Sequence, residues 1–371
     1  MVQAMARIRT LTARELAVAT LHRQGLLERW CCSAAEAVHR LVAVQAQWSP
    51  APYAALAARV EGFAVADLER ALRRGTVVKS TLMRGTLHLV AARDLPALAG
   101  ASLEHSARRL RGGRNRELDL GEAFVDELRA YLSEPRTTDE LRAHVAERVP
   151  DAFAPGGPLD VARLLVAHVH ELPSGLFDRH GKFALRAWEG ALEPEPAATA
   201  ALAAAYLAAY GPATRDDLAA FSWLSLTQLD RGLAELGPLR RLTDEAGREL
   251  LDLPRAPLPR EAVATPPRLL SRFDHAWLAY RDREHHRLGD ARPIFSSVNA
   301  EVRASYLLDG RLAGTWRLDS GRMAAATLVL EPLPGGPGAS AELEAEAERT
   351  VAVLAPDADR RNIAWDAAFH A

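Results

Sequence analysis

One short pattern recurs three times along this chain and restricts its possible folds more than any other feature. A threonine, an acidic residue three positions later and a leucine directly after the acid begin at Thr12, Thr137 and Thr214. In the first two copies the acid is glutamate, which is typical of a capping box: the threonine oxygen accepts from an early N–H group and the glutamate reaches back. In the third copy Asp217 is shorter, and we expect it to reach less well. The pattern predicts three helix starts.

Each predicted start is followed by helical segments and then by a β-rich stretch that turns back on itself. The segments with helical periodicity are 12–24, 33–47, 52–60, 65–74, 137–148, 158–171 and 225–237. The β-rich stretches are 77–90, 172–188 and 238–253, with turns expected at Arg84-Gly85, His180-Gly181 and Ala246-Gly247. Helix, helix and hairpin, three times in this order, is the layout of winged-helix modules.

Two segments with several prolines, 189–198 and 254–268, bound the third of these units. Beyond them we expect strands near 303–308, 312–318 and 324–330 and a helix at 339–354. The predicted boundaries are 1–100, 101–190 and 191–260 for the three units and 261–371 for a C-terminal mixed α/β segment. The fold class is therefore expected to be mostly α with small β-hairpins (α+β).

Composition agrees with a globular chain and excludes several classes of protein. Hydrophobic residues make up 49% and charged residues 25% of the 371 residues, as in ordinary globular domains. No uncharged apolar run approaches the ~18 residues of a transmembrane helix, and the first residues lack a secretory pattern. The adjacent Cys31 and Cys32 can neither staple a fold nor complete a zinc site. We expect a cytoplasmic protein with no membrane partner.

Charge is unevenly distributed although the formal net charge is only -2. Lysines are rare among the 46 basic residues, which GC-rich codon usage explains. Residues 105–116 contain five arginines and no acid, whereas residues 342–348 contain four glutamates. Such a layout suits a protein with one face turned to a polyanion. The candidate phosphate contacts in the basic stretch are Arg108, Arg109, Arg111, Arg114 and Arg116, with a solvated loop as the alternative reading.

Three segments of the chain, LVAVQAQWSPAPYAALAARV, STLMRGTLHLV and LLSRFDHAWLAYRDR, carry a resemblance to a known family. They resemble the bacterial winged-helix DNA-binding family that contains the AlkZ and YcaQ DNA glycosylases, and the likeness spans almost the whole chain. Gln45-Ala46-Gln47 is similar to the catalytic Gln-apolar-Gln motif of the AlkZ branch; the YcaQ branch has an acid at the second position. The run from Met83 to His88 resembles the family's strand signature, and Phe273-Asp274 its C-terminal signature.

This resemblance implies three tandem winged-helix units in a concave arrangement that cradles double-stranded DNA. It implies a monofunctional DNA glycosylase that hydrolyses the N-glycosidic bond of bulky alkylated purines, including crosslinks in some members. Several relatives protect producers of DNA-alkylating natural products. We expect no cofactor and no metal, and a monomeric protein. The alternative is a non-enzymatic winged-helix DNA-binding protein such as a transcriptional regulator, which would bind with a large sequence preference.

Gln45 and Gln47 are the residues that we expect to carry catalysis. Glutamine has no usable pKa, but an N7-alkylated purine is already cationic and leaves as a neutral base without an acid. The remaining task is to orient a water molecule, for which two amides offer acceptor oxygens and donor hydrogens. Residues i and i+2 diverge on a helix, and Pro50 and Pro52 follow. Both glutamines are therefore expected in the last turn of helix 33–47 or just past it.

Several further side chains are candidates for the pocket or for DNA contact. Thr86 and His88 lie two apart on a predicted strand and share a face, where they complete the pocket or simply pack inside the hairpin. We expect His88 to hold a phosphate or donate to the water, and Arg84 at the turn to contact phosphate or solvent. Arg179 and Lys182 on the second hairpin are candidate DNA-backbone contacts. The remaining cluster, His168, His170 and Glu171, is rejected as a metal site because alternate residues diverge on a helix.

Overall fold

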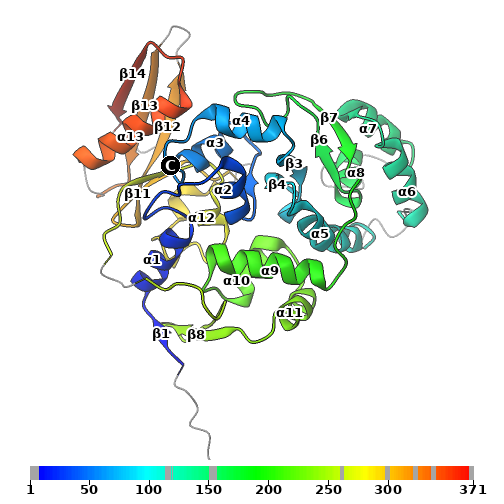
Figure 1. Cartoon of the computed structure of the whole chain (residues 1–371), viewed down its shortest axis with the longest axis horizontal. Helices are drawn as coiled ribbons and strands as arrows, with labels where there is room; N and C mark the ends of the chain where they lie inside the picture. The colour runs from blue at the N-terminus through cyan, green and yellow to red at the C-terminus, as the bar shows by residue number, and fades with distance from the viewer. Residues whose placement is uncertain are drawn as a thin grey trace, which may run out of the picture.

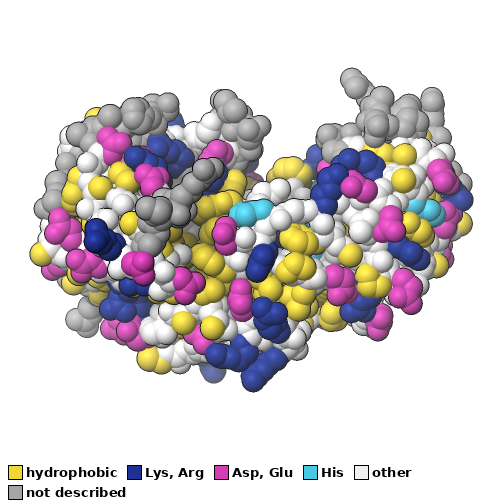
Figure 2. All heavy atoms as spheres, turned by 90° about the horizontal axis from the view of Figure 1, so that it is seen from above, with side chains coloured by type: hydrophobic (Ala, Val, Ile, Leu, Met, Phe, Trp, Pro, Cys, Tyr) yellow, Lys and Arg dark blue, Asp and Glu magenta, His cyan; other side chains and the backbone are white. Residues whose placement is uncertain are grey.

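The computed structural model describes residues 8–112, 118, 120–149, 157–259, 263–296, 301–320, 325–335 and 340–366. Figure 1 shows the first unit near the centre, the second unit at one end of the long axis, the third along one side and the C-terminal sheet at the opposite end. Seen from above in Figure 2, the body is hollowed between the C-terminal sheet and the second unit. On this face positive and negative side chains are interspersed rather than gathered in one basic patch.

The first unit combines helices with a three-stranded sheet. Its elements are α1 (Ala13–Arg23), α2 (Ala34–Arg40), β2 (Val44–Gln45), α3 (Ala51–Ala57), α4 (Val65–Arg73), β3 (Val77–Thr81) and β4 (Leu87–Ala91). The sheet order is β2-β4-β3, so the short strand β2 lies beside the last strand of the hairpin. The turn expected at Arg84-Gly85 is confirmed, since the 3-10 turn η1 (Met83–Gly85) joins the two hairpin strands.

The second unit repeats this order behind the long helix α5 (Leu95–Leu110). Its elements are α6 (Glu122–Tyr131), β5 (Arg136–Thr137), α7 (Thr138–Ala146), α8 (Pro158–Leu165), β6 (His168–His170) and β7 (Ala184–Ala187). The sheet order is β5-β7-β6, which again puts the short early strand beside the last strand of the pair.

The third unit has the same order, with one strand contributed by the N-terminus. Its elements are α9 (Ala197–Tyr210), α10 (Arg215–Ser222), α11 (Leu226–Glu235), β8 (Arg240–Asp244) and β9 (Glu249–Asp252). Ala213 forms an isolated bridge with Leu251 of β9, in the place that β2 and β5 take in the other sheets. On the other edge β1 (Thr10–Leu11) pairs parallel to β8.

The C-terminal segment is a five-stranded sheet of order β10-β11-β12-β13-β14. Its elements are β10 (Arg268–Leu270), α12 (His275–Leu278), η3 (Arg292–Ile294), β11 (Ser305–Leu308), β12 (Arg311–Ser320), β13 (Ala325–Pro332), α13 (Ala341–Leu354) and β14 (Arg360–Trp365). The three strands and the helix predicted for this segment are confirmed. The crossover helix α13 connects β13 to its parallel neighbour β14, as parallel pairing requires.

All three predicted helix starts are confirmed, and each carries a complete capping box. Thr12 accepts from Glu15 N at 3.0 Å, and Glu15 accepts from Thr12 N at 2.9 Å. The expectation that Asp217 reaches less well was wrong. Its Oδ2 accepts from Thr214 N at 3.0 Å, and its Oδ1 accepts from Arg281 N at 2.9 Å. The shorter carboxylate therefore caps α10 and also ties it to the C-terminal segment.

Two predicted helices end earlier than the periodicity indicates. The helix expected over 33–47 ends at Arg40, because Val42 adopts the left-handed conformation with φ 67 and the chain then pairs with β4. The helix expected over 158–171 ends at Leu165, and residues 168–170 form strand β6. The turn expected near 180–181 consequently lies in the long connection between β6 and β7.

The hydrophobic core joins the first unit to the third unit and to the C-terminal sheet. Tyr53 and Leu56 of α3 pack in one cluster with Trp316 and Leu328 of the C-terminal sheet. A second cluster joins the first hairpin to the third-unit helices. The second unit has a separate cluster built from its own helices and the end of α5. The first unit is therefore held on two sides by elements far along the chain.

Candidate active site

Gln45 is buried on β2 and held by the arginine at the tip of the first hairpin. It lies opposite His88 of β4, and its side chain is almost inaccessible to solvent. Its Oε1 accepts from Arg84 Nη2 at 3.0 Å, while Arg84 Nη1 donates to the carbonyl oxygen of Phe221 at 2.6 Å. One guanidinium thus fixes the amide of Gln45 and connects it to α10. Because only the amide oxygen can face a guanidinium, the NH2 group of Gln45 points away from it.

Gln47 is exposed and only loosely held, although it belongs to the same motif. Its Oε1 accepts from Leu87 N at 3.4 Å, and the backbone pairing with β4 continues through Ala46 N to Leu87 O at 2.7 Å. Of the two expected placements, the last turn of the helix was wrong. Both glutamines lie past the end of α2 at Arg40, Gln45 on the extended strand β2 and Gln47 two residues further on. In an extended segment residues i and i+2 share one face, which removes the divergence that a helix would impose.

Two histidines form the buried wall behind Arg84. His88 is fully buried, its Nδ1 lies 2.9 Å from Thr86 O, and its ring centroid is 5.5 Å from that of His275. The Nε2 of His88 is buried with no hydrogen-bond partner among the described residues. His275 Nε2 lies 3.4 Å from Arg84 Nη2, and its Nδ1 is 3.3 Å from Tyr210 Oη. These contacts enclose the inner side of the guanidinium.

Burial keeps both imidazoles neutral. Burial first, and then the charge of Arg84, lowers the pKa of His88 to about 3. The pKa of His275 is also held well below its usual value, mainly by burial. Burial lowers the pKa of Arg84 to about 10, so Arg84 remains the cation of this cluster at neutral pH. The site is a set of neutral amides and imidazoles around one positive charge.

Asp274, from the C-terminal signature, orients this wall rather than facing the glutamines. It accepts from Arg59 Nη2 at 2.7 Å and Nη1 at 2.9 Å, and both side chains are almost completely buried. Its Oδ1 also accepts from Ala276 N at 2.9 Å and so caps α12. The carboxylate therefore fixes the helix that presents His275.

The structure changes the interpretation of three predicted site residues. Arg84 points inward to Gln45 and Phe221 instead of outward to phosphate or solvent. His88 cannot hold a phosphate, because it is 0% exposed. Thr86 is half-buried at the hairpin exit, where its hydroxyl donates to Met83 O at 3.3 Å. The hairpin therefore contributes an arginine that holds Gln45 in place, and this arginine does not face a phosphate.

The predicted DNA contacts on the second hairpin differ in their availability. Arg179 is exposed, and its carbonyl oxygen accepts from Ser49 Oγ at 2.6 Å, which brings this loop within two residues of Gln47. Lys182 is exposed but paired with Asp139, with Nζ 2.8 and 2.9 Å from the two carboxylate oxygens. The structure thus brings Arg179, but not Lys182, to the motif.

The basic stretch at the end of α5 is partly engaged within the protein. Arg108 pairs with Glu104, and Arg111 Nε donates to Leu120 O at 2.9 Å. The guanidinium of Arg109 lies 4.9 Å from the ring centroid of Trp223. Arg114 and Arg116 lie outside the described residues.

Sequence reasoning missed three residues of the site: Tyr210, Phe221 and His275. They come from α9, α10 and α12, far from the glutamine motif in sequence. The only available signal was the position of His275 directly after Phe273-Asp274. Nothing in the sequence marked the carbonyl oxygen of Phe221 as a partner of Arg84.

The rejected histidine cluster lies on a strand, not on a helix. His168 Nε2 is 3.2 Å from Thr81 Oγ1, His170 Nδ1 is 3.2 Å from Ser174 Oγ, and Glu171 pairs with Arg186. Within the described ranges, no group of three or more His, Cys, Asp or Glu residues is placed to hold a metal ion. The helices described there are also too short or too polar to cross a bilayer.

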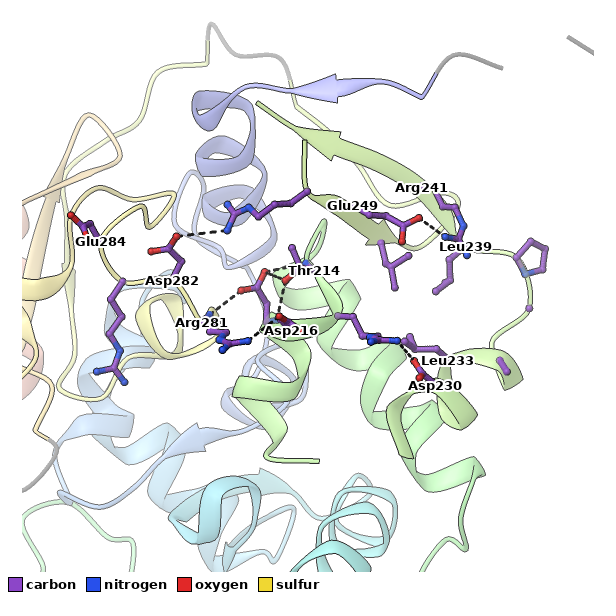
Figure 3. A pocket seen from close by; sticks show the side chains of 18 of the residues that line it. Thr214, Asp216, Asp230, Leu233, Leu239, Arg241, Glu249, Arg281, Asp282 and Glu284 are labelled. Atoms are coloured by element: carbon purple, nitrogen blue, oxygen red, sulfur yellow. Dashed lines mark hydrogen bonds and ion pairs between the residues drawn. The ribbon is translucent and has the colours of Figure 1, made fainter. Parts of the chain in front are cut away.

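A large cavity of about 1420 Å³ lies elsewhere, between the third unit and residues 281–292. Figure 3 shows several of its charged side chains paired with one another. Arg215 Nη1 is 2.8 Å from Asp230, Arg281 Nη1 is 2.9 Å from Asp216, and Arg241 pairs with Glu249. Neither glutamine of the motif lines this cavity, which we call the ion-paired basin.

Comparison with known proteins assigns this chain to a family and supports its fold. The sequence profile described as DNA glycosylase AlkZ-like matches residues 38–353. This match defines the class of protein, a DNA repair glycosylase whose substrate is DNA. Within that class, the chain belongs to the AlkZ-like DNA glycosylase family.

A solved structure supports the same fold. The chain is similar to the Streptomyces sahachiroi DNA glycosylase AlkZ, with 24% sequence identity and a TM-score of 0.79, covering 96% of this chain and 100% of that one. At this identity the likeness shows the architecture. A search among curated proteins found no match.

Proposed function

We propose that this protein is a monofunctional glycosylase that removes cationic N7- or N3-alkylated purines from double-stranded DNA, with bulky adducts and crosslinks within its range. The observation that carries the proposal is the fixed amide of Gln45 beside the exposed amide of Gln47. Self-protection against a DNA-alkylating natural product is one setting for such an activity, and the neighbouring genes test it.

The two amides suit a reaction in which the leaving group is already activated. The oxygen of Gln45 faces Arg84, so its NH2 group is available to donate to a water oxygen. The oxygen of Gln47 accepts a long bond from Leu87 N, which leaves a second lone pair for a water hydrogen. The water attacks the sugar carbon as the glycosidic bond breaks. The bonding electron pair goes to the cationic base, which departs neutral, and the proton that the attacking water loses passes to bulk solvent. Positioning of this kind is a major source of rate enhancement.

Arg84 is a positioning residue in this proposal. Its planar guanidinium reaches Phe221 O and Gln45 Oε1 at once, so it sets the direction of the Gln45 dipole before substrate binds. His88 and His275 pack around it as neutral rings. Their neutrality matters, because further positive charge would oppose the oxocarbenium-like transition state.

DNA binding is assigned to the small helix-and-hairpin units, which we interpret as three tandem winged-helix modules. Support comes from the shared sheet order, in which a short strand or bridge between two helices of each unit lies beside the last hairpin strand. We assign Arg109 and Arg179 to the DNA-facing side, while Arg114 and Arg116 remain predictions. We also propose that the protein acts as a monomer.

The experiment uses a duplex with a single N7-methylguanine and measures base release by chromatography. The expected result is release of the modified base, an abasic site without strand cleavage, and no effect of a chelator. The same duplex with guanine is the control and should yield no free base. Sequence-selective binding without base release would instead identify a non-enzymatic DNA-binding protein.

A further inference from the structure

Trp223 is an exposed aromatic side chain held in an unfavourable backbone conformation. It ends α10 with φ 63 and ψ 13, the left-handed region that bulky residues rarely occupy. Its side chain is 48% exposed, and Leu226 on the same turn is 39% exposed. Strain of this kind is typically retained at ligand-binding sites.

The turn that carries Trp223 is attached directly to the glutamine site. Phe221, two residues earlier, accepts from Arg84 Nη1 at 2.6 Å, and the Arg84 guanidinium lies 5.5 Å from its ring centroid. The same guanidinium holds Gln45. Both α10 and α5 contact the hairpin tip η1. Trp223 therefore lies at the surface two residues after Phe221, the residue that binds Arg84. Arg84 in turn orients the Gln45 amide.

Arg109 stacks on Trp223 without a carboxylate partner in the described part of the chain. Its guanidinium lies 4.9 Å from the indole centroid, whereas its neighbour Arg108 is paired with Glu104. With Arg109 over its ring, Trp223 is still 48% exposed and so keeps accessible indole surface. A cation beside an exposed aromatic ring is the combination that binds unstacked nucleobases and their phosphates.

A second tryptophan–arginine pair shows what a structural stack looks like in this protein. Arg272 lies 5.0 Å from the Trp48 ring centroid, next to Gln47, but it is neutralised by Glu301 and the indole is half-buried. The Trp223–Arg109 pair is exposed and has no such acid. It is therefore available to a ligand.

We propose that Trp223 is a nucleobase-binding platform: its exposed indole stacks on a base that leaves the helix at the lesion, while Arg109 contacts the adjoining phosphate. The inference rests on the proposed function. A base stacked on Trp223 would keep the duplex open at the lesion while the glutamine site acts. Chemistry on a base within a duplex often requires unstacking, and a stacking partner lowers its cost.

The test is a binding experiment that does not depend on excision. The probe is an undamaged duplex with one unpaired 2-aminopurine, and a second arm places 2-aminopurine opposite an abasic analogue. Fully paired duplex is the reference. We expect Trp223→Ala to weaken binding to the unpaired-base duplex by about tenfold and to abolish 2-aminopurine quenching, on the scale of one lost base stack. Binding to paired duplex should change less than twofold.

Three variants separate stacking from folding and from general apolar contact. Trp223→Phe should restore part of the affinity, because it keeps an aromatic face. Leu226→Ala removes the neighbouring exposed side chain and should leave binding unchanged. Trp223→Gly suits the left-handed conformation, so it should raise the melting temperature while binding is lost. Comparison of the two probes shows which base binds Trp223. It is the 2-aminopurine whose quenching is lost in Trp223→Ala, either the unpaired base or the base opposite the abasic analogue.

Several outcomes would overturn the proposal. Equal losses with Trp223→Ala on paired and unpaired duplex would make this a general contact, and equal effects of Leu226→Ala would make it a nonspecific apolar face. If the wild type is a dimer and Trp223→Ala dissociates it, the Trp223 surface is an interface between two copies of the chain. Normal stacking with no excision by the wild type would instead count against the glycosylase alone.

Discussion

The glutamine site and the ion-paired basin differ in how their charges are neutralised. In the basin, arginines such as Arg215 and Arg281 lie against aspartates, and the pairs are largely exposed. At the hairpin tip, Arg84 meets only neutral acceptors, a carbonyl and an amide oxygen. Size and charge density would select the basin as the functional site, whereas our proposal places that site at the hairpin tip. A charged or polar group that has no oppositely charged partner, such as Arg84, is the kind that can act on a substrate.

The physical reason lies in what each contact leaves available. An exposed ion pair is worth about 0–1 kcal/mol and leaves little field beyond itself. Of the basin pairs, Arg281–Asp216 connects residues 281–292 to the third unit, whereas Arg215–Asp230 lies within that unit. In the glutamine site, burial of Arg84 and of both imidazoles fixes an amide dipole in a region of low dielectric, where such a dipole is most effective.

The largest expected effect is on the glutamines themselves. Gln45→Ala or Gln47→Ala should lower the single-turnover rate of base release by ~10²-fold, because each removes a group that orients the water. The double variant should be little worse than the poorer single one, as for residues that act as a unit. DNA affinity serves as a control and should be nearly unchanged in both variants. The melting temperature should be nearly unchanged for the exposed Gln47→Ala but lower for Gln45→Ala, which leaves Arg84 Nη2 without its amide acceptor. Full activity of both single variants would exclude them as the catalytic pair.

A smaller effect is expected from substitution of Arg84, which holds Gln45. Arg84→Lys keeps the charge but cannot reach Phe221 O and Gln45 Oε1 together, since an ammonium is a point donor. The rate should fall by ~10-fold with little change in KM, on the scale of a misplaced catalytic group. Single-turnover rates at saturating enzyme measure this. A change in affinity with an unaltered rate would return Arg84 to the role of a phosphate contact.

Removal of the α5 arginines should act on binding alone. Alanine at Arg108, Arg109 and Arg111 should flatten the dependence of log K on log salt by up to ~0.9 per lost phosphate contact. Because Arg108 and Arg111 have partners within the protein, Arg109 should account for most of the change. Titrations at four salt concentrations measure the slope. An unchanged slope of log K against log salt would show that the end of α5 does not contact DNA.

Acid should destabilise the fold without altering the chemistry. The folded-state pKa of His88 is lowered to about 3, so the unfolded chain binds the extra proton below ~6.5. Stability from this residue is complete above that pH and is lost as pH falls towards 3, up to ~2 kcal/mol at pH 5. Urea unfolding at pH 7.5 and 5 measures it, and His88→Gln should reduce the difference. Base release should be flat from pH 6 to 8, because His88 stays neutral there.

The smallest effect is expected in the basin. Arg215→Ala breaks the pair with Asp230 and should change base release by less than twofold and the melting temperature only slightly, as for exposed ion pairs. It also provides the matched control for the α5 arginines, since it removes one exposed arginine from a neutralised pair. A loss of activity comparable to that of Gln45→Ala would place the reactive site in the basin.

Local features of the fold could be predicted because their energies come from neighbouring residues. Thr12, Thr137 and Thr214 begin helices through contacts only three residues away, and Arg84-Gly85 turns the hairpin. The motif Gln45-Ala46-Gln47 could also be identified from the sequence. Its backbone could not, because β2 is extended only through its pairing with β4, more than forty residues later.

The sequence by itself determined where helices start, where the first hairpin turns and which two amides are candidates for catalysis. Only the tertiary structure decided what those amides can do. Arg84 turns inward because Phe221 O and Gln45 Oε1 are brought together by α10 and β2, and a buried guanidinium must satisfy its donors. Capping and turn preferences act over a few residues, whereas burial and long-range hydrogen bonds depend on which segments the whole fold brings into contact.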